Sequence, residues 1–216
     1  MSPQDAFLHE GFRRLVRGRL RGVWLRGTIP TGRVVWAANH HSWWDPFLAD
    51  VLVRAEGRSA ALVMTEEGLR EFGFVRRLGV VGTTEVRAAT AMVRAQQVLV
   101  VFPEAEICSP GRPGPLSRGA AWFAERTDAT LVAAAVRVTI RGQEAPEAYV
   151  DLRPVGLDGG SAVATERLSA VLGDALASID AAIAGTDPRV PLAGFTEAVR
   201  GRRSWDERLA RLGRRR

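Results

Sequence analysis

The chain has 216 residues, of which 46% are apolar and 25% are charged, with one cysteine and three histidines. This length and composition favour a single globular domain, and they exclude a disordered chain, a disulfide framework and a zinc site built from cysteines. All 30 basic residues are arginine. The absence of lysine excludes Schiff-base chemistry and phosphate binding by a P-loop lysine.

The net charge of +6 is unevenly distributed. Residues 1–33 and residues 201–216 each carry a net charge of +5, whereas residues 34–200 carry −4. A mildly acidic body with two basic ends favours an anionic partner, either a membrane surface or a nucleic acid. Neither a signal peptide nor an uninterrupted apolar run of bilayer length is apparent. We therefore expect a cytoplasmic protein, peripheral on the inner face of the cell membrane.

The first segment predicts a basic amphipathic helix. Apolar residues recur at helical spacing from Asp5 to about Leu20, and most arginines of this segment fall on the opposite face. A helix that lies in a membrane interface has this pattern, and so has a surface helix packed on its own domain. We expect residues 1–30 to form an amphipathic membrane-surface segment, with packing on the domain as the alternative.

Short apolar runs alternate with helical stretches along the rest of the chain. We expect strands at 34–38, 60–64, 98–102 and 130–140, helices at 46–53, 90–97, 118–126 and 163–183, and a short helix and loop over 66–78. The alternation is typical of an α/β fold with a mixed, mostly parallel sheet flanked by helices. One domain is expected over residues 1–200, followed by an Arg-rich tail over 201–216 that lies on anionic lipid or forms a solvated end.

One polar segment separates the strand at 34–38 from the helix at 46–53, and it reads Asn39-His40-His41-Ser42-Trp43-Trp44-Asp45. Catalytic residues of α/β folds often lie where a strand ends and a helix begins. His40 and Asp45 are close enough for the carboxylate to accept a hydrogen bond from one ring nitrogen, which leaves the other nitrogen free to take a proton. A purely structural pair, a core histidine and a helix cap, fits the same spacing.

Asn39-His40-x-Ser42-x-x-Asp45 resembles the NHxSxxD signature of the PlsC-like glycerolipid O-acyltransferases, the 1-acylglycerol-phosphate acyltransferase family. The run from Val98 that ends in Phe102-Pro103-Glu104 is similar to the strand and FPEG block of that family. Further on, Leu116-Ser117-Arg118-Gly119-Ala120 is similar to its F-K-x-G-A helix start. The resemblance covers roughly residues 30–140.

The resemblance implies transfer of a fatty acyl group from acyl-CoA or acyl-carrier protein to a hydroxyl of a lipid acceptor, as in phospholipid biosynthesis. His40 is then the general base and Asp45 its partner, and no acyl-enzyme forms. The thioester is a co-substrate, and neither a cofactor nor a metal is implied. The backbone N–H groups of the 39–45 turn are candidate oxyanion donors. The residues implied for substrate binding are Asn39, Ser42, Phe102, Pro103, Glu104, Arg87 and Arg118.

Two departures from the family pattern concern the acceptor. Ile107 stands where the family continues its FPEG block with an arginine, and Glu85 stands at the arginine of an earlier block, roughly G-x-I-x-x-x-R. A carboxylate repels a phosphate that an arginine would bind. We therefore expect a non-phosphorylated or cationic acceptor in place of lysophosphatidate. The alternative is that Arg87 or Arg112 fills the role from another backbone position.

Other function classes fit parts of the pattern. They are a thioesterase-like hydrolase with water as acceptor, a non-catalytic lipid-binding protein and a basic nucleic-acid-binding protein. The acidic body and the lack of a nucleic-acid motif argue against the last. The expected partners are an acyl thioester donor, which is acyl-CoA or acyl-carrier protein, a lipid acceptor and a membrane surface, with no nucleic acid.

Overall fold

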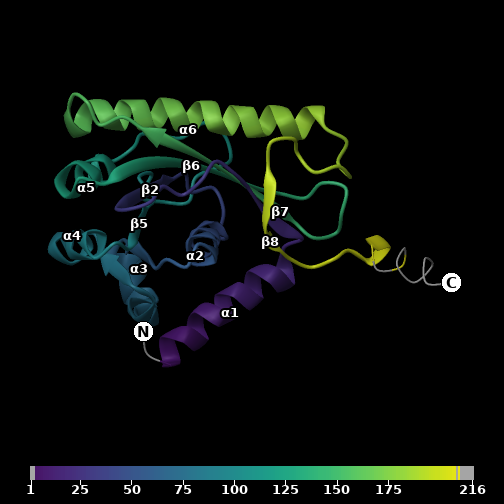
Figure 1. Ribbon diagram of the computed structural model, residues 1–216, viewed down its shortest axis with the longest axis horizontal. Helices are drawn as coiled ribbons and strands as arrows, with labels where there is room; N and C mark the ends of the chain where they lie inside the picture. The colour runs from purple at the N-terminus through teal and green to yellow at the C-terminus, as the bar shows by residue number, and fades with distance from the viewer. Residues whose placement is uncertain (1–2, 208, 210–216) are drawn as a thin grey trace.

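In the computed structural model, which describes residues 3–207 and 209, eight strands form one sheet in the order β4-β3-β5-β2-β6-β7-β1-β8 (Figure 1). The strands are β1 (Gly22–Arg26), β2 (Val34–Ala38), β3 (Ala60–Met64), β4 (Val80–Gly82), β5 (Val98–Val101), β6 (Thr130–Thr139), β7 (Glu147–Val155) and β8 (Thr196–Arg200). Neighbouring strands are parallel from β4 through β6 and between β7 and β1, and antiparallel pairs join β6 to β7 and β1 to β8. The expected α/β fold with a mostly parallel sheet is confirmed.

Helices cover both faces of this sheet (Figure 1). They are α1 (Pro3–Arg19), α2 (Asp45–Ala55), α3 (Glu66–Glu71), α4 (Val86–Arg94), α5 (Gly119–Thr127) and α6 (Gly160–Gly185), with a 3-10 helix η1 (Gly73–Leu78). Val34, Trp36 and Ala38 of β2 pack with α1 and α2, whereas Val35 and Ala37 pack with α4, α5 and α6. Because β2 is buried on both faces, its sequence is a continuous apolar run.

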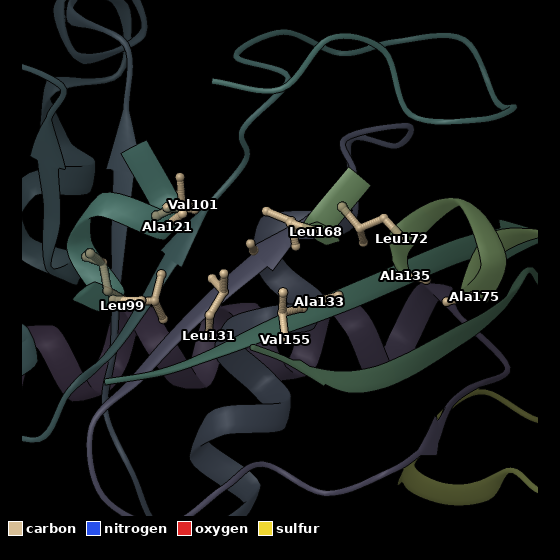
Figure 2. Packing of buried hydrophobic residues seen from close by; sticks show 14 of the residues in the cluster. Leu99, Val101, Ala121, Leu131, Ala133, Ala135, Val155, Leu168, Leu172 and Ala175 are labelled. Atoms are coloured by element: carbon tan, nitrogen blue, oxygen red, sulfur yellow. The ribbon is translucent and has the colours of Figure 1, made fainter. Parts of the chain in front are cut away.

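The long helix α6 lies along one face of the sheet. Leu168, Leu172 and Ala175 are fully buried and point toward β6, where Ala133 and Ala135 leave room for them (Figure 2). By length and composition this helix could cross a membrane, and it is the one helix of the described residues with that property. The core helix of a soluble protein passes the same test, and α6 has the burial pattern of a helix packed on a sheet.

The chain changes direction at the centre of the sheet. From β2 it passes through α2 on one face to β3, and from β5 it passes through α5 on the other face to β6, on the far side of β2. Such a switch point opens a crevice at the carboxyl ends of the two strands, which is where α/β folds bind their ligands. Residues 39–45 follow β2 and Phe102 follows β5, and so both motifs lie at this crevice.

Several elements differ from the sequence prediction. The helix expected at 90–97 is α4 at Val86–Arg94, and it is followed by Gln96 with a φ of +65°, a conformation that ends a helix. The short helix expected within 66–78 is α3, and the part expected to be a loop contains the 3-10 helix η1. The apolar pattern does not predict β1, β4, β7 and β8. β4 has three residues, β1 and β8 contain charged and partly exposed residues, and β7 contains buried acids.

The buried acids of β7 are held in ion pairs with arginines. Glu147 of β7 is buried and accepts hydrogen bonds from Arg21 at 2.6 Å and from the Tyr149 hydroxyl at 2.6 Å. Burial and the neighbouring carboxylate raise the pKa of Tyr149 to about 12, so its hydroxyl stays a donor. Asp151 accepts a hydrogen bond from Arg26 at 2.7 Å. Arg21 directly precedes β1 and Arg26 is its last residue, so these two ion pairs hold β1 beside β7.

The two basic ends are partly fixed to the body. Val16 and Leu20 at the end of the first segment are buried, so the packing alternative holds for that part of the segment. At the other end, Arg202 pairs with Glu144 at 3.0 Å and Glu207 pairs with Arg21 at 3.1 Å. Membrane binding by residues 1–30 stays a prediction, and positions 208 and 210–216 of the expected tail lie outside the described residues.

Candidate active site

Asp45 organises the turn between β2 and α2. It is the first residue of α2 and is buried, and its Oδ2 accepts three hydrogen bonds. The donors are Nδ1–H of His40 at 3.0 Å, the backbone N–H of His41 at 3.0 Å and the backbone N–H of Ser42 at 2.9 Å. A carboxylate accepts only, so the ring of His40 carries its proton on Nδ1 and leaves Nε2 as an acceptor.

The position of His40 is fixed from two further sides. The Phe102 ring, just after β5, stacks on the imidazole with centroids 4.4 Å apart. Asn39 is fully buried and exchanges hydrogen bonds with the backbone of Val136 in β6, at 3.1 Å and 2.7 Å. Asn39 and Phe102 therefore position the turn against its two neighbouring strands. Ser42 also supports the turn, because its hydroxyl accepts a hydrogen bond from the Trp44 N–H at 3.2 Å.

Glu104 connects the turn with the loop that follows β5. Its Oε2 accepts a hydrogen bond from the backbone N–H of His40 at 2.7 Å, and its Oε1 accepts one from Gly114 at 3.0 Å. Pro103 contributes through its carbonyl, which accepts the N–H of Ser117 at 2.8 Å. Glu104 is 8% exposed. Both of its oxygens are thus used inside the protein, so Glu104 orients the turn and is less suited to the substrate binding that the resemblance implies.

A network behind the turn is not evident from the sequence motifs. Arg137 of β6 donates to Nδ1 of His41 at 2.7 Å, to the Gly111 carbonyl at 2.8 Å and to both carboxylate oxygens of Asp180 in α6. The bond from Arg137 requires the His41 proton to be on Nε2, which lies 3.5 Å from Glu104. The signal for this network was a single arginine inside an otherwise apolar strand.

Two pockets meet at His40. The α1-side pocket, of about 340 Å³, extends between α1, α2 and η1 and is lined mainly by apolar side chains, among them Phe12, Phe47, Leu62, Phe74, Val80 and Val100. The α5-side pocket, of about 480 Å³, extends on the other face of the sheet and includes Thr65, Thr83, Phe102, Glu106 and Phe123. Both pockets also include Pro46, Met64, Phe72 and Ile107. An apolar chain and a polar arm can therefore approach the same imidazole from two sides.

The arginines implied for substrate binding are not among the residues that line these pockets. Arg87 is exposed on α4 and lines a separate groove, and Arg118 is exposed at the residue before α5. Arg112, the alternative phosphate ligand, is also exposed on a loop. Within the described part of the chain, the charged residues that line the two pockets besides His40 are Asp50 and Glu106.

The residues that stand in place of the family's arginines and glycine each have a defined place in the structure. Ile107 is 58% exposed and lines both pockets beside His40. Glu85 accepts from the Gly82 N–H and forms a bidentate pair with Arg76 at 2.9 and 3.0 Å. These contacts hold the pKa of Glu85 below its ordinary value, so it is a carboxylate at neutral pH. Ala105, where the family has glycine, has a φ of +65°, which costs an L-residue about 1–2 kcal/mol.

The expected oxyanion donors of the turn are mostly engaged. The N–H groups of residues 40–42, 44 and 45 all donate within the turn or to Glu104. By contrast, the N–H groups of Glu106 and Ile107 find no acceptor among the described residues, and both residues line the α5-side pocket. Donors for a developing negative charge are therefore available after β5, and in the turn after β2 the Trp43 N–H is also without an acceptor among the described residues.

Cys108 is a poor candidate for a catalytic nucleophile, and the described residues form no metal site. Cys108 donates its N–H to the His40 carbonyl at 2.7 Å, but desolvation and the carboxylates of Glu104 and Glu106 raise the pKa of its thiol. A thiol with a raised pKa is a poor nucleophile at neutral pH. Within the described residues, no group of three histidine, cysteine or acidic side chains is arranged to hold a metal ion.

Comparisons with known proteins show the family and the fold of the chain. The model of the Acyltransferase family matches residues 23–137, which include the turn, the segment after β5 and the start of α5. A solved structure with a similar fold is the 1-acyl-sn-glycerophosphate (LPA) acyltransferase PlsC from Thermotoga maritima. The TM-score is 0.61 at 15% sequence identity, with 82% of this chain and 81% of that chain covered. Among curated proteins, no sequence relative matches. The family match covers more than half of the chain, and the chain therefore belongs to the acyltransferase family, with a PlsC-like fold.

Proposed function

We propose that the protein transfers a fatty acyl group from a thioester, acyl-CoA or acyl-carrier protein, directly to a hydroxyl of a lipid acceptor. The observation that carries the proposal is the 3.0 Å hydrogen bond between His40 and Asp45 at the junction of two pockets. It leaves Nε2 of His40 free to take the proton of the acceptor hydroxyl as the oxygen attacks the thioester carbonyl. The thiolate then leaves and takes up a proton.

Asp45 stabilises the imidazolium that forms in this step. The N-terminus of α2 compensates the Asp45 carboxylate, because a negative charge is favourable in the first turn of a helix. The N–H groups of Glu106 and Ile107 are our candidates for stabilising the negative charge on the thioester oxygen. No covalent acyl-enzyme is proposed, since the acceptor itself supplies the nucleophile and Cys108 has a raised thiol pKa.

The α1-side pocket suits the acyl chain. Its lining is mainly apolar, and four of its side chains, Trp43, Phe72, Phe74 and Ile107, are each more than 40% exposed. Exposed apolar side chains gathered at one pocket are typical of a membrane or ligand contact. We propose that this rim touches the inner face of the cell membrane, with the basic helix α1 beside it, and that the lipid acceptor enters here.

The charge of the pocket walls supports an acceptor without a phosphate. The described residues that line the pockets include no arginine, and the sequence contains no lysine. A phosphate beside Glu106 would be repelled, whereas an uncharged or cationic lipid alcohol would not, and the carboxylate of Asp50 is already paired with Arg54 at 2.8 Å. The acceptor that we propose is therefore a non-phosphorylated lipid alcohol, with a lysophosphatidate-type acceptor as the alternative.

The catalytic assignment is tested by product formation. With acyl-CoA and acyl-carrier protein offered separately with a mixed lipid extract, His40→Ala and Asp45→Asn should each lower acyl-lipid formation by about 10² to 10⁴-fold. Mass spectrometry identifies the product. Asp187→Asn, in an exposed loop, is the matched control and should keep full activity. Thiol release without any acylated lipid would contradict transfer and indicate hydrolysis.

The network behind the turn is tested by its arginine. Arg137→Met should lower kcat by about tenfold or more, because His41 and the loop at Gly111 lose the guanidinium that fixes them. Arg153→Met removes a half-buried arginine from the neighbouring strand, whose buried partner Asp151 keeps its hydrogen bond from Arg26, and should change kcat less than about twofold. Steady-state kinetics with a saturating donor measure both. Equal kcat values for the two variants would mean that the network does not position the site.

The acceptor assignment is tested by a comparison of two lipids with the same donor. A monoacylglycerol should give a kcat/KM about tenfold higher than lysophosphatidate, because the pocket offers carboxylates and no guanidinium. Ile107→Arg should raise the kcat/KM for lysophosphatidate by about tenfold and leave the monoacylglycerol value nearly unchanged. Robust turnover of lysophosphatidate by the natural chain, with no gain in the variant, would overturn the assignment.

A further inference from the structure

A basic groove lies between α4 and α5, outside the two pockets that meet at His40. It has a volume of about 510 Å³, and its lining includes Arg87, Arg94 and Arg126 with Trp122 and Thr90. The two helices lie side by side on the same face of the sheet (Figure 1). No acidic side chain is among the described residues that line the groove.

The arginines of this groove differ from most arginines of the body. Arg26, Arg137 and Arg141 are held by carboxylates, as the charges of a stable fold usually are. Arg87, Arg94 and Arg126 are exposed and make no hydrogen bond or ion pair with a described residue. Of the acids nearest to them in sequence, Glu125 lies beside Gly160 at the start of α6 and Glu85 pairs with Arg76. The groove therefore presents uncompensated positive charge to a ligand.

Trp122 adds a flat aromatic surface to this charge. Its side chain is 39% exposed, and its ring contacts Phe123 at a centroid distance of 5.2 Å. An exposed indole beside guanidinium groups suits a ligand that combines an aromatic base with phosphates. Arginine binds both phosphates and carboxylates in a bidentate manner, and three arginines in one groove suit a ligand that carries more than one phosphate.

Among the described residues, the groove shares no lining residue with the α5-side pocket, but residues that neighbour it in sequence line that pocket. Phe123, the neighbour of Trp122, lines the α5-side pocket, and so does Thr83, which lies shortly before the start of α4. A ligand anchored between α4 and α5 can thus extend a flexible arm past Thr83 and Phe123 to the imidazole. The apolar end of the same molecule would enter the α1-side pocket on the other side of His40.

We propose that the groove between α4 and α5 binds the phosphorylated adenosine of CoA, with Arg87, Arg94 and Arg126 on its phosphates and Trp122 against its adenine. The inference rests on the proposed function, because it names the donor of that transfer. A concave groove with an aromatic side chain fits a nucleotide better than it fits the acidic surface of a carrier protein. Under this assignment Arg87 contacts the donor and not the acceptor.

Calorimetric titration tests the groove without requiring turnover. CoA should bind the natural chain about tenfold more tightly than dephospho-CoA, which lacks the ribose phosphate. In an Arg94→Gln/Arg126→Gln variant, the affinity for CoA should fall by about tenfold or more and the preference for CoA over dephospho-CoA should disappear. Arg19→Gln removes an exposed charge at the far end of the molecule, on α1, and should change neither affinity.

Equal affinities for CoA and dephospho-CoA in all three proteins, or no binding of CoA at all, would overturn the assignment. An increased KM for acyl-carrier protein in the double variant, with unchanged CoA binding, would also overturn it and assign the groove to the carrier. The results distinguish a failure of the groove assignment from a failure of the proposed acyl transfer. Loss of the phosphate preference with no acyl transfer by the natural chain would support the groove and reject the function.

Discussion

The candidate site depends on one carboxylate oxygen. Oδ2 of Asp45 accepts the N–H groups of His41 and Ser42 and the Nδ1–H of His40, so the same atom closes the turn and orients the imidazole. The turn has little freedom, because β2 and α2 on its two sides are buried in the core. Backbone geometry and histidine orientation are therefore fixed together, and the position of Nε2 follows from the packing of the sheet.

The sheet topology then brings the second motif to the first. β2 and β5 are neighbours, but their following helices pack on opposite faces, which opens the crevice where the two chain segments meet. Glu104 connects them through the His40 N–H, and Arg137 connects both to α6 through Asp180. The same division of the two faces creates the apolar pocket on one side and the approach from the basic groove on the other.

Much of this arrangement could be predicted from the sequence, since strands buried on both faces have continuous apolar runs and the motifs follow directly after them. β2 and β3 agree with their predicted bounds, and the fold class is confirmed. The pairing of His40 with Asp45 was also predictable, because five residues across a turn limit where the carboxylate can lie. Their catalytic role stays a proposal.

Long-range polar contacts were not predictable in this way. Glu147 and Asp151 interrupt the apolar pattern of β7, and Arg21 and Arg26, which pair with them from the side of β1, are more than a hundred residues away in the sequence. No sequence motif connects Asp180 with the turn at His40. The two come together only because α6 packs on the sheet beside β6. Arg87 and Arg118 were implied by resemblance alone, and the structure shows that neither lines the pockets at His40.

The most direct test of the central claim is the tautomer of His40. The chain has three histidines, so a ¹⁵N spectrum of histidine-labelled protein is simple, and His40→Ala assigns the relevant signal. The account predicts that neutral His40 carries its proton on Nδ1 and has an unprotonated Nε2, whereas His41 next to it has the opposite tautomer. A proton on Nε2 of neutral His40, or a tautomer that does not change in Asp45→Asn, would contradict the claim that Asp45 prepares this imidazole as a base.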